Sequence, residues 1–76
     1  MEHFEILKVG AEPNKRFLVK GMVQTHWSSQ HYAHKFLTLK EASDEASSYE
    51  NVTIIWVNGS SWGEVAPSVL ASIDKF

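Results

Sequence analysis

Residues 38–59 read TLKEASDEASSYENVTIIWVNG and predict a helix followed by a buried strand. Thr38 and Glu41 have the spacing of a capping box, in which both residues satisfy free amides at the start of a helix. Apolar side chains then recur at spacings of three and four, which is typical of one narrow helical stripe. Its members are Leu39, Ala42, Ala46 and Tyr49. This alanine-rich stripe predicts a helix that lies close on a sheet.

The strand that follows spans residues 52–57, VTIIWV, and is apolar at both odd and even positions. This pattern predicts a strand buried on both faces, and therefore a central place in the sheet. Asn58-Gly59 is a strong turn signal, so we expect the chain to reverse near Ser60.

The first half of the chain predicts three further strands. Residues 3–9 alternate, with Phe4 and Ile6 on one face, and a turn rich in Gly, Pro and Asn follows over residues 10–15. Residues 16–27 alternate well enough to predict one long second strand, with Gly21 as a candidate bulge. Residues 31–37 predict a third strand.

Residues 60–76 leave two interpretations open. In the preferred one, residues 62–66 form a short final strand and Pro67 opens an amphipathic helix. The apolar side of that helix would hold Val69, Leu70, Ile73 and Phe76. In the other, Ser61 and Glu64 form a second capping box and a helix runs through Pro67, where an interior proline costs about 3 kcal/mol.

The fold class predicted is a single small α+β domain over residues 1–76. It has an antiparallel sheet of four strands, five if residues 62–66 pair, with one helix packed on it in the order β-β-β-α-β, and a short C-terminal helix. A chain of 76 residues buries only a small core. We therefore also expect it to use a partner or a second copy of itself, as a homodimer.

Composition excludes several classes of function. The chain has no cysteine, which removes disulfide frameworks, thiolate zinc sites and cysteine nucleophiles. Neither a signal peptide nor a membrane span is indicated, so the expected location is the cytoplasm. The net charge is −2, made of +3 in residues 1–40 (six basic, three acidic) and −5 in residues 41–76 (one basic, six acidic). This balance disfavours a domain that mainly grips phosphate backbones.

No residue pattern predicts catalysis, a cofactor or a metal. The four histidines have poor ligand spacing, because residues 31 and 34 fall on opposite faces of a strand, and we interpret them as ordinary surface residues. They are His3, His26, His31 and His34. The serines lie in turn-like segments without the context of a nucleophile elbow. The chain is therefore predicted not to be an enzyme.

Exposed aromatic and acidic side chains are the candidate partner-binding residues. Trp27 and Trp62 each lie beside a predicted turn, where a large amphipathic ring often anchors a binding partner, and Tyr32 lies near them. A small negative face on the helix, formed by Glu41, Asp44 and Glu45, could steer a basic target. The alternative is a mildly basic platform that stacks on single-stranded nucleic acid. That platform would comprise Lys20, His26, Trp27, His31, Tyr32 and Lys35.

The order of a strand pair, Phe36-Leu-Thr-Leu-Lys-Glu-Ala42, an alanine-rich helix and Val52-Thr-Ile-Ile-Trp-Val-Asn-Gly59 resembles many small phage-encoded inhibitor proteins. Host-takeover proteins and some anti-CRISPR proteins have this layout, which covers roughly residues 16–59 here. The resemblance implies a protein that blocks a larger host complex by occupying its surface. It supplies no catalytic motif, so no functional residue is carried over.

Overall fold

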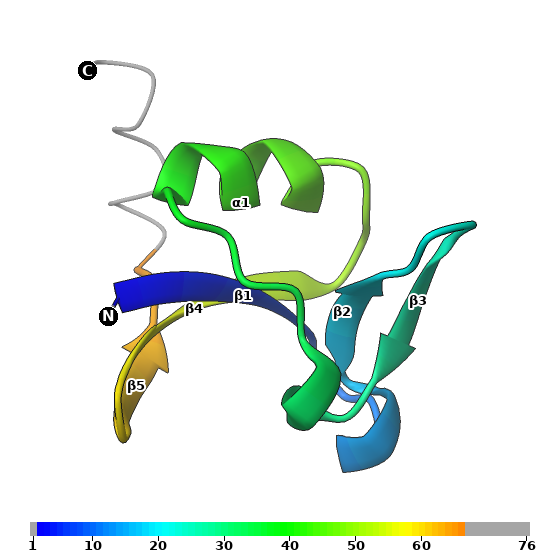
Figure 1. Cartoon of the computed structure of the whole chain (residues 1–76), viewed down its shortest axis with the longest axis horizontal. Helices are drawn as coiled ribbons and strands as arrows, with labels where there is room; N and C mark the ends of the chain where they lie inside the picture. The colour runs from blue at the N-terminus through cyan, green and yellow to red at the C-terminus, as the bar shows by residue number, and fades with distance from the viewer. Residues whose placement is uncertain (1, 67–76) are drawn as a thin grey trace.

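The computed structural model describes residues 2–66, which form one antiparallel sheet with a single α-helix across one face (Figure 1). The elements are β1 (Glu2–Lys8), η1 (Pro13–Lys15), β2 (Phe17–Lys20), β3 (Thr25–Ser28), η2 (Gln30–Tyr32), α1 (Leu39–Ala46), β4 (Val52–Asn58) and β5 (Ser61–Glu64), where η denotes a 3₁₀ turn. The strands lie in the order β3-β2-β1-β4-β5. The prediction of a small α+β architecture with one helix on an antiparallel sheet is confirmed; the sheet has five strands, two of which differ from those predicted.

The longest strand pairing in the sheet is that of β1 with β4. It runs over seven residue pairs, from Glu2 with Asn58 to Lys8 with Val52. Ile54 and Ile55 are both buried although they point to opposite faces, so the predicted burial of residues 52–57 on both sides is confirmed. The middle strand is β1, and β4 lies beside it.

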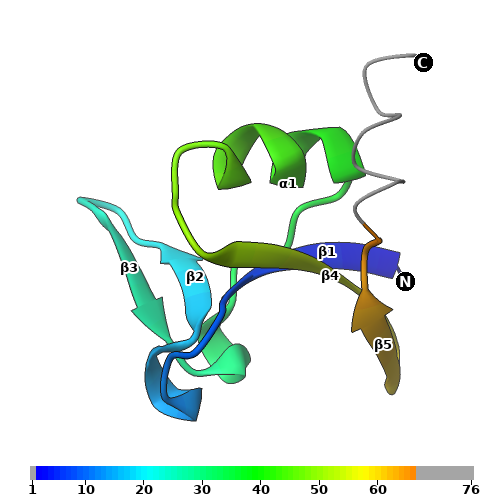
Figure 2. The ribbon, with the colours of Figure 1, turned by 180° about the vertical axis from the view of Figure 1, so that it is seen from behind.

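The segment predicted as one long strand, residues 16–27, is instead a hairpin of two short strands. The chain reverses between β2 and β3, where the Gly21 amide donates to the Gln24 carbonyl over 3.1 Å. A Cβ atom at Gly21 would lie only 2.7 Å from that oxygen, so the turn requires glycine there. Val23 at the tip falls on the same side of the alternation as Val19 and Trp27, so the sequence pattern concealed the turn. The hairpin extends away from the helix–sheet layers (Figure 2).

The prediction of a third strand over residues 31–37 is wrong, because this segment forms only an isolated bridge. Residues 30–32 form η2, and the following segment crosses a gap where β1 and β2 diverge. There the His34 amide donates to the Leu18 carbonyl, and Phe4 and Phe36 exchange two backbone hydrogen bonds of 2.8 Å. Residues 34–36 therefore bridge two strands without forming one.

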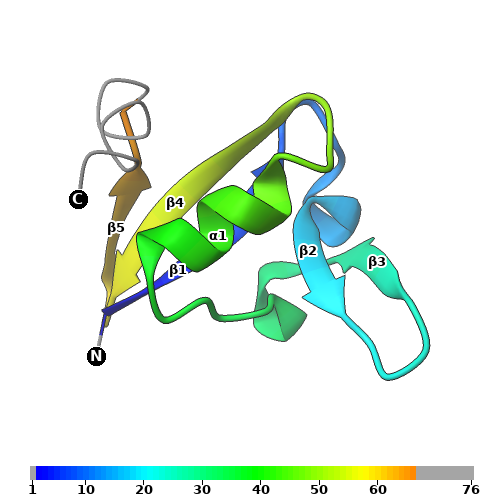
Figure 3. The same ribbon diagram turned by 90° about the horizontal axis from the view of Figure 1, so that it is seen from above.

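Helix α1 begins where the capping box predicts. The Thr38 side-chain oxygen accepts a hydrogen bond from the Glu41 amide at 3.2 Å, which satisfies one of the free amides of the first turn. The helix crosses diagonally over β1 and β4 (Figure 3). It ends at Ala46, so Tyr49 packs on the core from the connection to β4.

The hydrophobic core lies between α1 and the sheet. Its buried members are Ile6, Leu18, Phe36, Ala42, Ile54 and Val65. Ala42 is completely buried, and its small side chain lets the helix approach the strands closely. Trp56 is half-buried and lies against Gly63, where a Cβ atom would come within 3.0 Å of the indole nitrogen.

The predicted C-terminal helix from Pro67 lies outside the described residues. Over residues 2–66, no helix is long and apolar enough to cross a membrane.

Candidate binding surface

The face of the sheet opposite α1 carries a hollow of about 500 Å³. We call it the Trp62 hollow and define it by the residues that line it: Leu7, Pro13, Arg16, Phe17, Ser29, Gln30, His31, Ile55 and Trp62. Figure 1 shows both 3₁₀ turns on this side of the sheet, below β1 and β4, with β5 descending on the same side at the other end of the sheet. The hollow thus combines a strand floor with walls from segments distant in sequence.

Strand alternation produces the floor. Leu7, Phe17 and Ile55 each follow or precede a residue of the core, so their side chains point to the opposite face. Phe17 and Ile55 are buried although, over residues 2–66, no α-helix covers this side. The floor is therefore an apolar surface of the kind that ligand and partner pockets use.

One wall of the hollow is the exposed aromatic side chain of β5. Trp62 pairs with Val57 and keeps 63% of its surface exposed. The other wall comes from η2, where His31 lines the hollow and its ring meets Tyr32 edge-on at a centroid distance of 5.0 Å. Tyr32 is itself 63% exposed. Two of the three predicted aromatic anchors therefore belong to the hollow or its margin.

A buried carboxylate attaches η2 to the sheet. Glu5, in the middle of β1, is only 4% exposed. One of its oxygens accepts from the Gln30 side-chain nitrogen at 3.2 Å, and the other lies 2.8 Å from His3 Nε2. We call the hydrogen-bonded group of Glu5, Gln30 and His3 the Glu5 clip. Because Gln30 directly precedes His31, the Glu5 clip positions one wall of the hollow.

Arg16 fixes the loop around η1 in a similar way. Its Nε and Nη2 atoms both donate to the Ala11 carbonyl, at 3.0 and 2.8 Å. The side chain therefore holds the connection between β1 and β2 in place where Pro13 and Arg16 line the hollow. Apolar floor, aromatic wall and a few fixed polar groups together suit the binding of an apolar side chain from a partner.

Trp27, the third predicted anchor, lies on the other side of the sheet. Its ring packs edge-on against Tyr49 at a centroid distance of 5.5 Å, and the Lys8 ammonium sits 5.3 Å from the ring centre. Trp27 is half-buried at the margin of the core. The structure therefore does not bring it together with Trp62 and Tyr32.

The acidic side chains of α1 are partly engaged within the chain. Lys20 from β2 reaches Glu45 at 3.1 Å, and Lys40 lies 3.5 Å from Asp44 within the helix. The Tyr49 hydroxyl, which donates to Glu45 over 2.8 Å, and the Lys20 ammonium hold the pKa of the Glu45 carboxyl below its ordinary value. Glu41 is exposed. The acidic face is on the opposite side of the molecule from the Trp62 hollow.

The residues of the alternative nucleic-acid platform are divided between two faces. Trp27 and Lys20 lie on the α1 side, where they contact Tyr49 and Glu45. His31 lines the hollow on the opposite face. A single strand of nucleic acid would therefore not meet these groups on one continuous surface.

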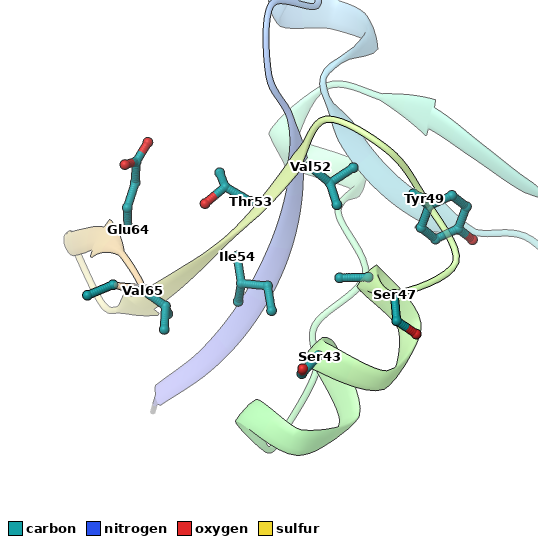
Figure 4. Close-up of a pocket in the computed structure, with 10 residues that line it drawn as sticks. Ser43, Ser47, Tyr49, Val52, Thr53, Ile54, Glu64 and Val65 are labelled. Atoms are coloured by element: carbon teal, nitrogen blue, oxygen red, sulfur yellow. The ribbon is translucent and has the colours of Figure 1, made fainter. Parts of the chain in front are cut away.

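A larger hollow of about 680 Å³ opens between α1 and the strands β4 and β5 (Figure 4). Figure 4 shows Ile54 and Val65 pointing toward the helix, with Ser43 and Ser47 on the helix side. The aromatic residue that lines it, Tyr49, is half-buried and already contacts Trp27 and Glu45, whereas Trp62 is exposed. For that reason we place the candidate site at the Trp62 hollow.

Reasoning from the sequence missed two features of the surface. The first feature is the exposed hairpin tip, where Met22 and Val23 are 105% and 96% exposed. The expected long strand would have buried one of these two side chains. The second feature is the burial of Glu5, which the alternation of residues 3–9 does not indicate and which the position of Gln30 explains. A two-residue apolar turn has no glycine or asparagine signal within it, so the sequence held little to reveal the first.

Within residues 2–66, no group of three or more His, Cys, Asp or Glu side chains converges to hold a metal ion. Comparisons with models of protein families, with curated proteins and with solved structures found no match to this chain.

Proposed function

We propose that this chain is a non-enzymatic binding module that recognises a host protein through the Trp62 hollow and so blocks a larger complex. The observation that carries the proposal is the exposed Trp62 beside an apolar floor, on a sheet face that no α-helix of the described part of the chain covers. Exposed tryptophan next to a desolvated apolar surface is typical of the few residues that dominate binding energy at protein interfaces.

The inhibitory role is supported by the resemblance of residues 16–59 to small phage-encoded inhibitors. A stoichiometric inhibitor needs only a surface that matches its target, and a standard interface takes about 800 Å² per partner. A face with two exposed aromatic rings, Trp62 and Tyr32, can provide the centre of such an interface. The partner would insert an apolar side chain between Trp62 and His31.

The test compares partner recovery between matched variants of the full chain. Tagged wild type, Trp62→Ala and His31→Glu are incubated with extracts of candidate bacterial hosts, and retained proteins are quantified by mass spectrometry. Met22→Ala and Leu37→Ala serve as controls, because both residues are highly exposed and lie outside the hollow. Thermal unfolding confirms that each variant is folded.

We expect one host protein to be retained by wild type and by both controls, and to be lost from the two hollow variants. With that protein purified, Trp62→Ala should weaken binding at least about tenfold, as expected for a central aromatic anchor. Equal affinity of wild type and both hollow variants for every retained protein would refute the proposal.

A further inference from the structure

Strand β5 is one edge of the five-stranded sheet. Its four residues pair with β4 in an antiparallel register that places Ile55 opposite Glu64 and Val57 opposite Trp62. In such a ladder, directly opposed residues alternate between pairs that exchange hydrogen bonds and pairs that do not. The register therefore decides which backbone groups of β5 point toward β4 and which point outward.

Backbone hydrogen bonds at two independent places determine this alternation. The Val65 amide donates to the Ile54 carbonyl at 2.9 Å, so residues 65, 63 and 61 direct their backbone groups toward β4. Phe4 bonds Phe36 on the side of β1 that faces away from β4, so Phe4 does not bond β4. Its partner Trp56 must then direct its backbone groups toward β5, which agrees with the Val65–Ile54 bond. The amides and carbonyls of Trp62 and Glu64 therefore point outward, and over residues 2–66 no strand pairs with this edge of the sheet.

We propose that the β5 edge binds an extended segment of a protein partner, which adds to the sheet as a sixth, antiparallel strand. Trp62 and Glu64 would each exchange two backbone hydrogen bonds with it, as in other cases of strand addition to a sheet edge. This inference rests on the proposed function in that both use Trp62. It goes further by naming the conformation and chemistry of the partner.

The side chains beside the edge define what the partner carries. Trp62 and Glu64 are two residues apart and project to the same face, opposite α1. Figure 4 shows the Glu64 carboxylate pointing away from the helix, and no ion pair engages it over residues 2–66. Opposed side chains in an antiparallel pair interact directly, so an aliphatic residue fits opposite Trp62 and a basic one opposite Glu64.

An antiparallel partner meets Glu64 before Trp62. Its sequence, read from the amino end, is therefore a basic residue, any residue, then an aliphatic one. The middle residue lies opposite Gly63, whose own backbone groups bond β4. The segment recognised is thus short, extended and positively charged, which complements the −5 charge of residues 41–76.

The experiment titrates the ¹⁵N-labelled full chain with the capped peptide Ser-Arg-Thr-Ile-Thr-Ser and follows backbone amides by NMR. We expect the largest shifts at the amides of Trp62 and Glu64. N-methylation of the arginine and isoleucine should abolish these shifts, because those amides would bond β5, whereas N-methylation of the central threonine should preserve them. Replacing the arginine by glutamate should weaken binding roughly fivefold or more.

Three variants separate this edge from the hollow. Glu64→Pro removes an outward amide that β4 does not use, so the hairpin should persist while peptide binding is lost. Glu64→Ala keeps the amide and should lose only the preference for arginine. His31→Glu alters the hollow and should leave peptide binding unchanged.

Shifts centred away from β5, or the same response to both N-methylated peptides, would overturn the inference. So would concentration-dependent broadening of the Trp62 and Glu64 amides without peptide, since the occupant would then be a second copy of the chain. If a host protein is lost with His31→Glu but still binds Glu64→Pro with wild-type affinity, the hollow is its site and the edge inference alone fails. If Glu64→Pro releases the host protein and His31→Glu retains it, the edge alone is the site.

Discussion

Replacement of the buried carboxylate of Glu5 by alanine should loosen η2 and lower the stability of the domain. In the native structure this carboxylate accepts from Gln30 at 3.2 Å and lies 2.8 Å from His3 Nε2. Glu5→Ala removes both interactions and leaves a small void on the face of β1. Because Gln30 is exposed and His3 is only partly buried, both side chains can form hydrogen bonds to water in the variant. The loss of stability is therefore smaller than the cost of leaving a buried polar group without a partner.

The expected loss follows from the number and kind of bonds. Hydrogen bonds to a carboxylate contribute about 1.5–3 kcal/mol when buried and less when a partner can rehydrate, so we expect about 2 kcal/mol in total for Glu5→Ala. With a urea dependence of about 1 kcal/mol per molar for a domain of this size, the unfolding midpoint should fall by about 2 M. Glu5→Gln keeps an acceptor for Gln30 and a polar group beside His3, so it should cost less than about 1 kcal/mol.

Urea unfolding followed by tryptophan fluorescence measures both variants against wild type. The Gln30 side-chain amide resonances provide a local probe, because they should move to solvent-like positions in Glu5→Ala and stay dispersed in Glu5→Gln. An unchanged midpoint for Glu5→Ala, or equal losses for both variants, would refute the role assigned to the Glu5 clip.

Three further predictions concern the core, the helix and one ionisable pair. Ile6→Ala, at a side chain that is 0% exposed, should cost about 2–5 kcal/mol and largely unfold the domain in circular dichroism, whereas Met22→Ala should leave the melting temperature unchanged. Thr38→Ala should lower the free energy of unfolding by about 1 kcal/mol in the same urea assay, through loss of the helix cap. Tyr49→Phe should destabilise the chain at pH 7, since the hydroxyl helps to hold the pKa of Glu45 below its ordinary 4.5. A carboxyl whose pKa is lowered by folding stabilises the native state at pH values above 4.5 and loses that contribution as it becomes protonated. The difference in unfolding free energy between wild type and Tyr49→Phe should therefore narrow as the pH falls below 4.5. A difference that does not change with pH would contradict this prediction.

The candidate site could be predicted only in part from the sequence. The position of Trp62 after an Asn-Gly turn indicated an exposed ring, and the structure leaves it exposed. Trp27 had the same local signal but packs against Tyr49, 22 residues further along the chain. Local pattern reports that a ring lies near a turn, whereas the face to which it points depends on which segment arrives to cover it.

The polar part of the site was outside the reach of local reasoning. The Glu5–Gln30 hydrogen bond joins residues 25 apart, and nothing in the alternation of β1 distinguishes a glutamate that is buried from one that is solvated. The outward groups of β5 likewise follow from the register with β4, because a shift of one residue would exchange inward for outward amides.

The amino-acid sequence by itself determined the helix and its starting point, the doubly buried strand β4 and the turn after it, since capping, apolar periodicity and Asn-Gly chemistry act within a few residues. Tertiary structure decided where β2 ends and β3 begins, and that residues 34–36 bridge two diverging strands instead of forming one. It also decided that Trp62 stands over an apolar floor. These features depend on the pairing partners of each segment, and a chain acquires those partners only when distant residues meet.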